Sequence, residues 1–319
     1  MNAVEAVVNA GGDAVARLLE RIEARMLSLA AENGPLLGRY AGDTITAGGK
    51  RLRPLLVCLS AGVPPPETDG LVHAAVAVEL VHAATLVHDD VLDGSSLRRG
   101  RPTVIASGGR LLATATGDLL FSRAFAELTA SSSVDAVRVL SRASSELAEG
   151  ELMQRADAYE VELGVERYLA RCRLKTGVLF RAACSLGALE GCGEVDGLGR
   201  FGEQIGIAFQ ILDDILDVSG PPERTGKPIG TDLLDGTVTL PLILARQRDR
   251  ELQAVDLRTL TAADAVSVCQ RIAATDALIV ARRRALELVA LGKEALPVLS
   301  ERQRSALELV ADGVVERYS

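Results

Sequence analysis

The chain has 319 residues, of which 48% are hydrophobic and 24% charged, as is usual for a globular protein with a large buried core. The formal charge is −8, from 43 acidic and 35 basic residues, which argues against a nucleic-acid-binding protein. Aromatic residues are scarce, with five Phe, four Tyr and no Trp, so the core must be built from Ala, Leu and Val. Because such residues suit close helix packing, we expect an all-α protein. Because the net charge is acidic, we expect no nucleic-acid partner.

Cysteines and apolar stretches bear on where the protein works. The five cysteines are scattered, odd in number and lack CxxC spacing, which argues against a disulfide framework or a zinc site. The first residues lack a basic stretch followed by an apolar one, so no signal peptide is predicted. The segment Gly70 to Leu92 is apolar enough to suggest a membrane span, but Glu79, His82, His88 and Asp89 interrupt it, and burying them in lipid is costly. We predict a buried central helix there, and a cytoplasmic protein.

Helical periodicity dominates the chain from end to end. Apolar residues recur at helical spacing over residues 14–29, 71–93, 282–291 and 303–315, whereas the alternation typical of strands is nearly absent. Glycine and proline clusters separate the helical stretches, and we find no linker, low-complexity tract or short repeat. The sequence therefore predicts one all-α domain over residues 1–319.

The first candidate site lies at the end of the helix predicted over Leu71 to Asp93. Steps of three or four residues place His82, Asp89 and Asp93 on one stripe, with the two carboxylates one turn apart. Like charges at this spacing destabilise a helix unless a cation neutralises them, and Mg²⁺ prefers a few carboxylates together with substrate phosphate oxygens. A solvated helix end that carries surface acids is the alternative interpretation of one such cluster.

A histidine precedes this aspartate pair, and His88-Asp89 is also typical of HD-type metal phosphohydrolases. That class needs further spaced histidine and aspartate ligands, and this chain has three histidines in all. We therefore interpret His88 as a hydrogen-bonded core histidine.

Two basic segments flank the first cluster in the sequence, at Gly48–Pro54 and at Leu97–Thr103. Glycines let the backbone approach a phosphate, and Arg and Lys supply charge-assisted contacts to its oxygens. Neither segment has the GxxxxGK[ST] pattern of a P-loop. Either run alone is typical of a solvated surface, but together with acidic clusters they predict a pocket for two polyanions, one bound through metal and one through cations.

The second half of the chain repeats the acidic pattern. Phe209 to Leu212 lead into a second cluster, Asp213–Asp217, with Gln210 on the same helical face. Lys175 precedes a Thr-Gly pair, and Lys227 lies in a glycine- and proline-containing turn. Lys175 on its own is equally typical of a helix surface.

Six motifs then stand in a characteristic order: GGKRLRP, HDDVLD, LRRGRPT, KTG, FQILDDILD and TGKPIGTD. In this order they resemble the trans-polyprenyl diphosphate synthase family, in particular its long-chain bacterial members, over about Gly48 to Pro241. The resemblance implies a single-domain isoprenoid synthase fold with helices around a central active-site cavity, Mg²⁺ as cofactor, a homodimer, and loose membrane contact for product release. One departure is that Thr237 stands where the family usually has a lysine.

The same resemblance implies a prenyltransferase that condenses isopentenyl diphosphate with an allylic diphosphate by ionisation, condensation and elimination. Its implied Mg²⁺ ligands are Asp89, Asp93 and Asp213, supported by Asp90, Asp214 and Asp217. The residues implied to hold the allylic diphosphate are Arg98, Lys175, Gln210 and Lys227. Those implied to hold isopentenyl diphosphate are Lys50, Arg53, His82 and Arg99.

For the chemical step the implied catalytic residues are Lys175, Thr176 and Gln210. Metal and lysine charges stabilise the departing diphosphate, and the Thr176 hydroxyl and Gln210 carbonyl dipoles suit an allylic cation. We expect the departing diphosphate to take the proton, so no protein base is needed.

Product length depends on the room along the helix that carries Asp89. By the same resemblance, Phe or Tyr one turn before the aspartates plugs the cavity of short-chain enzymes in the family. This chain has Ala84 and Thr85 at that turn, and Val81 one turn earlier. We expect the tail to continue to a floor at Phe121 or Phe125, and the product to be long, from heptaprenyl to decaprenyl.

Besides the HD-type phosphohydrolase, three alternatives stay open at this point. A geranylgeranyl diphosphate synthase would share every motif, and a non-catalytic subunit of a heteromeric synthase usually loses aspartates that are all present here. A terpene cyclase is the third, but its second metal motif resembles NxxxSxxxE, and its pocket tends to be rich in the aromatics that are scarce in this chain.

Overall fold

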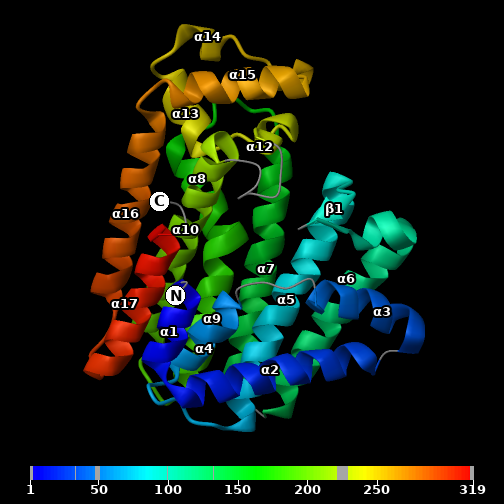
Figure 1. Ribbon diagram of the computed structural model, residues 1–319, viewed down its shortest axis with the longest axis vertical. Coiled ribbons are helices and arrows are strands. Elements are labelled where there is room, and N and C mark those ends of the chain that lie inside the picture. The colour runs from blue at the N-terminus through cyan, green and yellow to red at the C-terminus, as the bar shows by residue number, and fades with distance from the viewer. Residues whose placement is uncertain are drawn as a thin grey trace. The chain divides into compact units, whose positions relative to one another are not determined.

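The computed structural model describes residues 3–32, 34–46, 51–98, 100–131, 133–220 and 229–316, without the side chains of residues 3, 4, 35–37 and 46. Helices make up nearly all of the regular structure in these ranges (Figure 1). The helices of the first half are α1 (Ala3–Gly11), α2 (Asp13–Ala31), α3 (Gly34–Thr46), α4 (Leu52–Ser60), α5 (Asp69–Asp93), α6 (Val104–Ala130) and α7 (Val134–Ala156). Those of the second half are α8 (Val165–Cys172), α9 (Val178–Glu190), α10 (Val195–Ser219), α12 (Thr231–Leu234), α13 (Leu240–Arg246), α14 (Arg250–Gln253), α15 (Ala262–Ala273), α16 (Ala277–Ala295) and α17 (Glu301–Glu316).

Two short segments form helical turns of other kinds. A π-helical turn, η1 (Arg173–Gly177), joins α8 to α9, and a 3₁₀ turn, η2 (Leu257–Thr259), precedes α15. In the π turn the Val178 N–H donates to the carbonyl of Arg173, five residues back. Such turns hold one residue more than an α-helical turn and occur often at functional sites.

A two-stranded hairpin is the β structure within the described ranges. Strands β1 (Leu97–Arg98) and β2 (Arg101–Pro102) pair antiparallel, with Arg98 opposite Arg101, and Gly100 turns between them at φ +74°. The sequence did not predict these strands, because two residues on each side of a turn are too short to show alternation.

Residue contacts divide the chain into two compact units. Unit 1 comprises Met1–Ser144, Leu179–Gly202 and Ala295–Val310, and unit 2 comprises Ser145–Val178, Glu203–Glu294 and Ala311–Ser319. The single-domain organisation inferred from the sequence stays a prediction.

Helix α5 is the core helix of unit 1 and packs along α6 (Figure 1). The Thr68 side chain accepts from the Leu71 N–H and begins the helix, and Gly94 ends it at φ +64°. Its length and composition would suit a membrane span, yet 72% of its most apolar window is buried in the protein. It is apolar on nearly all sides because neighbours cover it, as the sequence predicted.

A buried ionic cluster ties α5 and α6 to α2. The Glu127 carboxylate on α6 lies 2.6 Å from Arg25 Nη2 and 2.7 Å from His73 Nδ1. Burial raises the pKa of Glu127, but the hydrogen bonds and charges of Arg25 and His73 lower it more, so this pKa lies below its ordinary value of 4.5. The paired carboxylate therefore contributes stability in its ionised form.

Candidate active site

The first aspartate cluster occupies the last turn of α5. Asp89 is half-buried and Asp93 exposed, whereas Asp90 is buried with 4% of its surface accessible. The Gly94 N–H donates to the Asp90 carbonyl and closes the helix directly after Asp93. A helix C-terminus carries partial negative charge, so carboxylates placed there require cations nearby.

The hairpin brings one such cation back to the helix end. The Arg98 guanidinium donates from Nε to Asp90 Oδ1 at 2.9 Å, and its Nη2 lies 2.8 Å from the same oxygen. Arg98 is half-buried, and Gly100 lets the chain reverse directly after this part of the motif. The ion pair fixes Arg98 beside the aspartates at the end of α5.

Two histidines stand on the same helix. His82 is half-buried, and the Thr85 hydroxyl donates to its carbonyl at 2.8 Å. His88 has 30% of its side chain exposed, its Nε2 lies 3.3 Å from Asp118 Oδ1, and its ring stacks on Phe121 with centroids 5.8 Å apart. His88 is thus a partly exposed residue beside an acidic partner, whereas the sequence predicted a core position.

Space for the His88 ring comes from a glycine on α6. A Cβ on Gly117 would lie 2.2 Å from His88 Nε2, closer than any real contact. Any larger residue at 117 would displace the ring from Phe121.

The basic segment before α4 is tied to unit 1 by its first described arginine. Arg51, at φ +46°, contacts Glu23 through Nε and Nη2 at 2.9 and 3.0 Å, and Glu79 through Nη1 at 3.0 Å. Arg53 lies 4.7 Å over the Phe180 ring. Arg51 therefore holds the start of α4 in place, a role that the sequence analysis missed because both glutamates are distant in sequence.

Three predicted binding residues, Lys50, Arg99 and Lys227, lie outside the described residues. Their predicted roles in holding the two diphosphates stay predictions.

The second aspartate cluster lies near the end of α10, in unit 2. Asp213 is exposed, Asp217 half-buried, and Asp214 buried with 4% of its surface accessible. Asp217 Oδ2 accepts from the Asp232 N–H at 3.2 Å, which caps the short helix α12. The clusters on α5 and α10 thus share one pattern, in which the second aspartate is the buried one.

Asp214 belongs to a chain of hydrogen bonds within unit 2. The Tyr168 hydroxyl donates to Asp214 Oδ2 at 2.6 Å, and Gln210 Nε2 donates to Oδ1 at 2.8 Å. The Thr176 hydroxyl in turn donates to Gln210 Oε1 at 2.7 Å. Two predicted catalytic residues, Thr176 and Gln210, are therefore in direct contact, and Tyr168 is a contributor that the sequence analysis missed.

Burial shifts the pKa values of this chain upward. It raises the pKa of the Asp214 carboxyl, the charges of Asp232 and Asp213 add to this, and the hydrogen bonds from Tyr168 and Gln210 oppose it, which leaves the pKa at about 8. Burial and the Asp214 charge hold the pKa of Tyr168 well above its ordinary value of 10. The Tyr168 hydroxyl therefore keeps its proton at any working pH.

Lys175 is held by an acidic partner. Its Nζ lies 2.6 Å from Glu151 Oε2, and both side chains are largely shielded. Burial raises the pKa of Glu151, but Lys175 and Arg155 lower it more, so the carboxylate is ionised at neutral pH. This ion pair orients the ammonium group of Lys175. The sequence alone had left open the interpretation of Lys175 as an ordinary surface lysine.

The loop that carries Thr237, where the family usually has a lysine, contacts a buried arginine. Thr237 is half-buried, and its N–H donates to the Asp232 carbonyl at 2.8 Å. One residue further on, the Val238 carbonyl accepts from Nη2 of Arg171, a residue that is 4% exposed. Positive charge at this loop thus lies under the backbone instead of on the side chain of residue 237.

The donor chemistry of the aspartates fits a hard divalent cation. Asp89 and Asp93 offer carboxylate oxygens one turn apart, and Mg²⁺ is commonly held by one or two carboxylates with the remaining ligands from phosphates and water. Within the described ranges, no group of three or more His, Cys, Asp or Glu side chains is arranged to hold a metal by itself. The supporting roles predicted for Asp90, Asp214 and Asp217 stay predictions.

The predicted chain-length residues lie where α5 faces its neighbours. Ala84 and Val81 are fully buried, Thr85 is half-buried, and both Phe121 and Phe125 on α6 are half-buried. Their effect on product length stays a prediction.

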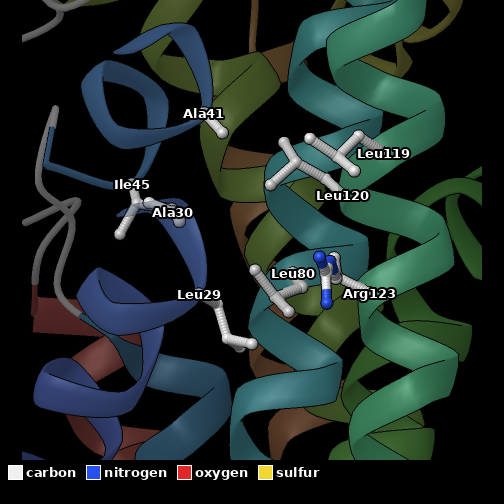
Figure 2. A pocket seen from close by; sticks show the side chains of 8 residues that line it. All are labelled: Leu29, Ala30, Ala41, Ile45, Leu80, Leu119, Leu120 and Arg123. Carbon is white, nitrogen blue, oxygen red and sulfur yellow. The ribbon is translucent and has the colours of Figure 1, made fainter. Parts of the chain in front are cut away.

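A small apolar pocket lies beside these positions in unit 1 (Figure 2). Helices α2, α3, α5 and α6 line it, and its empty volume is about 200 Å³, part of which is open solvent. Leu80 lies one turn before Ala84 on the same face of α5, and Leu120, next to Phe121, is almost fully buried. The lining residues are Leu29, Ala30, Ala41, Ile45, Leu80, Leu119, Leu120 and Arg123.

Comparisons with known proteins agree with one another. Residues 35–275 match the family model described as polyprenyl synthetase. Heptaprenyl diphosphate synthase component 2 of Geobacillus stearothermophilus is 43% identical over 246 residues, 76% of each chain. A geranylgeranyl diphosphate synthase of Methanosarcina mazei also matches, at 35% over 289 residues and 88% of each chain.

Solved structures extend the likeness to the fold. The heptaprenyl diphosphate synthase of Staphylococcus aureus has a TM-score of 0.88 at 28% identity and covers 96% of this chain and 99% of its own. A polyprenyl synthase of Caulobacter crescentus, complexed with calcium and isoprenyl diphosphate, has a TM-score of 0.87 at 35% identity and covers 99% and 98%. The predicted all-α fold class is confirmed.

Proposed function

The chain belongs to the polyprenyl synthetase family and is a trans-prenyltransferase, and we propose that it condenses isopentenyl diphosphate with an allylic diphosphate to make a long all-trans polyprenyl diphosphate. The observation that carries this proposal is the family match over residues 35–275, which contains both aspartate clusters and all six ordered motifs. Isoprenyl diphosphates are the substrates of this family, as the complex of the Caulobacter protein illustrates.

We assign Mg²⁺ to Asp89, Asp93 and Asp213, where it would neutralise the charge that develops on the departing diphosphate. Arg98 and Lys175 are cations oriented by Asp90 and Glu151, so each presents a fixed charge to the allylic diphosphate. Preorganised charges of this kind stabilise a transition state without reorganising during the reaction.

The allylic cation left by ionisation needs electron-rich neighbours that do not attack it. Thr176 and Gln210 supply a hydroxyl oxygen and an amide carbonyl, and their mutual hydrogen bond holds the two together. The double bond of isopentenyl diphosphate then attacks the cation, and the departing diphosphate takes the proton released from the new intermediate. No protein base is assigned to this step.

The proposed product runs from heptaprenyl to decaprenyl because Ala84 and Thr85 leave the first turn before the aspartates without a bulky plug. Geranylgeranyl diphosphate is the second candidate, favoured by the Methanosarcina relative. We propose a cytoplasmic homodimer with loose membrane contact at product release. The relative named component 2 makes a heteromer the alternative, which size-exclusion chromatography with light scattering distinguishes.

The test of the proposed function is direct. Purified protein is incubated with Mg²⁺, labelled isopentenyl diphosphate and farnesyl diphosphate, and the products are dephosphorylated and separated by chain length. We expect products longer than geranylgeranyl, and none in excess EDTA. Release of inorganic phosphate without condensation would indicate a phosphohydrolase, and a cyclic hydrocarbon would indicate a terpene cyclase. A lack of any turnover by the chain alone would favour the heteromer.

A further inference from the structure

The direction of the Gln210 amide is set by its buried neighbour. Gln210 Nε2 donates to Asp214 Oδ1 at 2.8 Å, so the amide turns its N–H toward Asp214 and its oxygen away from it. Oε1 then faces Thr176, whose single hydroxyl proton it accepts. Having given that proton to Gln210, Thr176 Oγ1 has only lone pairs to offer to a third group.

Gln210 lies one turn from Asp214 on α10, so their hydrogen bond does not fix the Asp214 carboxyl relative to other helices. A hydrogen bond from another helix is needed as this fixed reference. Tyr168 on α8 provides this reference through the 2.6 Å hydrogen bond to Oδ2. Its side chain is fully buried, so water does not compete for the hydrogen bond that its hydroxyl donates.

The π turn explains how one chain segment reaches both ends of this hydrogen-bonded chain. Tyr168 and Thr176 are eight residues apart, which on a regular α-helix is two turns and about 80°. Because η1 absorbs one extra residue, the offset falls to about 20°. Tyr168 and Thr176 thus both face α10, where Asp214 and Gln210 are themselves one turn apart.

We infer that Tyr168 is a positioning residue for the prenyl transfer: acting through Asp214, it fixes the Gln210 amide so that Gln210 Oε1 and Thr176 Oγ1 present lone pairs to the allylic cation. In this arrangement Asp214 anchors the amide instead of binding the metal. The inference rests on the proposed function, because it assigns the chain of hydrogen bonds to the allylic cation of that reaction.

The first test is Tyr168→Phe, which removes the hydroxyl and keeps the buried ring. Loss of one buried hydrogen bond predicts a kcat about tenfold lower, with both KM values within about twofold of the wild type. Tyr40→Phe is the matched control, since it removes a hydroxyl hydrogen bond to the Ser107 carbonyl on the surface of unit 1 and should leave kcat unchanged. A kcat for Tyr168→Phe equal to that of the control would overturn the inference.

A double-mutant cycle asks whether Tyr168 acts through Gln210. In a Gln210→Ala background the amide is absent, so Tyr168→Phe should lower kcat no further. An undiminished tenfold loss in that background would show that Tyr168 acts by another route, and would refute the proposed coupling.

Metal affinity separates an anchor from a ligand without relying on turnover. The rise in Tm on adding Mg²⁺ with inorganic diphosphate should be the same for wild type, Tyr168→Phe and Asp214→Asn, whereas Asp89→Ala should lose it. If Asp214→Asn loses this rise, Asp214 is a metal ligand and the anchoring role is wrong. Failure of the proposed function is a different result, because the wild type would then make no polyprenyl diphosphate at all.

Discussion

Ala84→Phe tests the assignment of the product path most sharply. Ala84 is fully buried on α5, five residues before Asp89, or about 7.5 Å along the helix axis. Leu80 at the apolar pocket lies about 13.5 Å from Asp89, and Ala77 about 18 Å. A phenyl ring at 84 would close the path at less than half of the depth to Ala77, so the main product should fall from heptaprenyl or longer to farnesyl or geranylgeranyl.

The same substitution strains the core, and this cost must be separated from the effect on length. Overpacking a buried site costs about 1–3 kcal/mol, so Tm should fall while the fold persists. Product length is read from dephosphorylated products by chromatography and mass spectrometry, with Ala84→Ser as the control that leaves the passage open. A product distribution unchanged from wild type, or a wild type that stops at geranylgeranyl, would refute the open path.

Other predictions address the metal, the diphosphates and stability. Asp89→Ala and Asp213→Ala should each abolish turnover with little change in Tm, because neither side chain lies in the core; unfolding at ordinary temperature would show a structural role instead. Arg98→Ala should raise KM for the allylic substrate more than for isopentenyl diphosphate, and Arg99→Ala the reverse, while equal effects would contradict the assignment. The folded pKa of Glu127 lies below 4.5, so its stabilisation is complete above that pH and is lost as the pH falls through the folded value. Urea unfolding should therefore show Glu127→Gln to be destabilised at pH 7 and much less so at pH 3.

Local patterns in the sequence were sufficient to predict the helices that carry the site. The helix over 71–93 became α5, and the stretches 14–29, 282–291 and 303–315 lie within α2, α16 and α17. Spacing of three and four residues also placed Asp89 and Asp93 on one turn, because that relation depends only on helix geometry.

Partners distant in sequence were not predictable in this way. Tyr168 meets Asp214 from 46 residues away, and Glu151 meets Lys175 across two helices. Neither pair leaves a periodic signal, because tertiary packing and not local spacing brings the side chains together. The burial of Asp90 and Asp214 was missed for the same reason, since nothing in the sequence of either motif distinguishes a buried aspartate from an exposed one.

The π turn between α8 and α9 has a consequence for how the chain tolerates insertions and deletions. Removing one residue ahead of Thr176 in the turn Arg173–Gly177 would let the segment relax into an ordinary α-helix, at a gain in local hydrogen-bond geometry. Tyr168 and Thr176 would then be seven residues apart on a regular helix, an offset of about 20°, so both would still face α10. Inserting one residue there would instead rotate Tyr168 by about 100° relative to Thr176, and the two side chains could no longer both meet α10. The loss of one residue from this turn therefore preserves the shared face of Tyr168 and Thr176, whereas the gain of one residue destroys it.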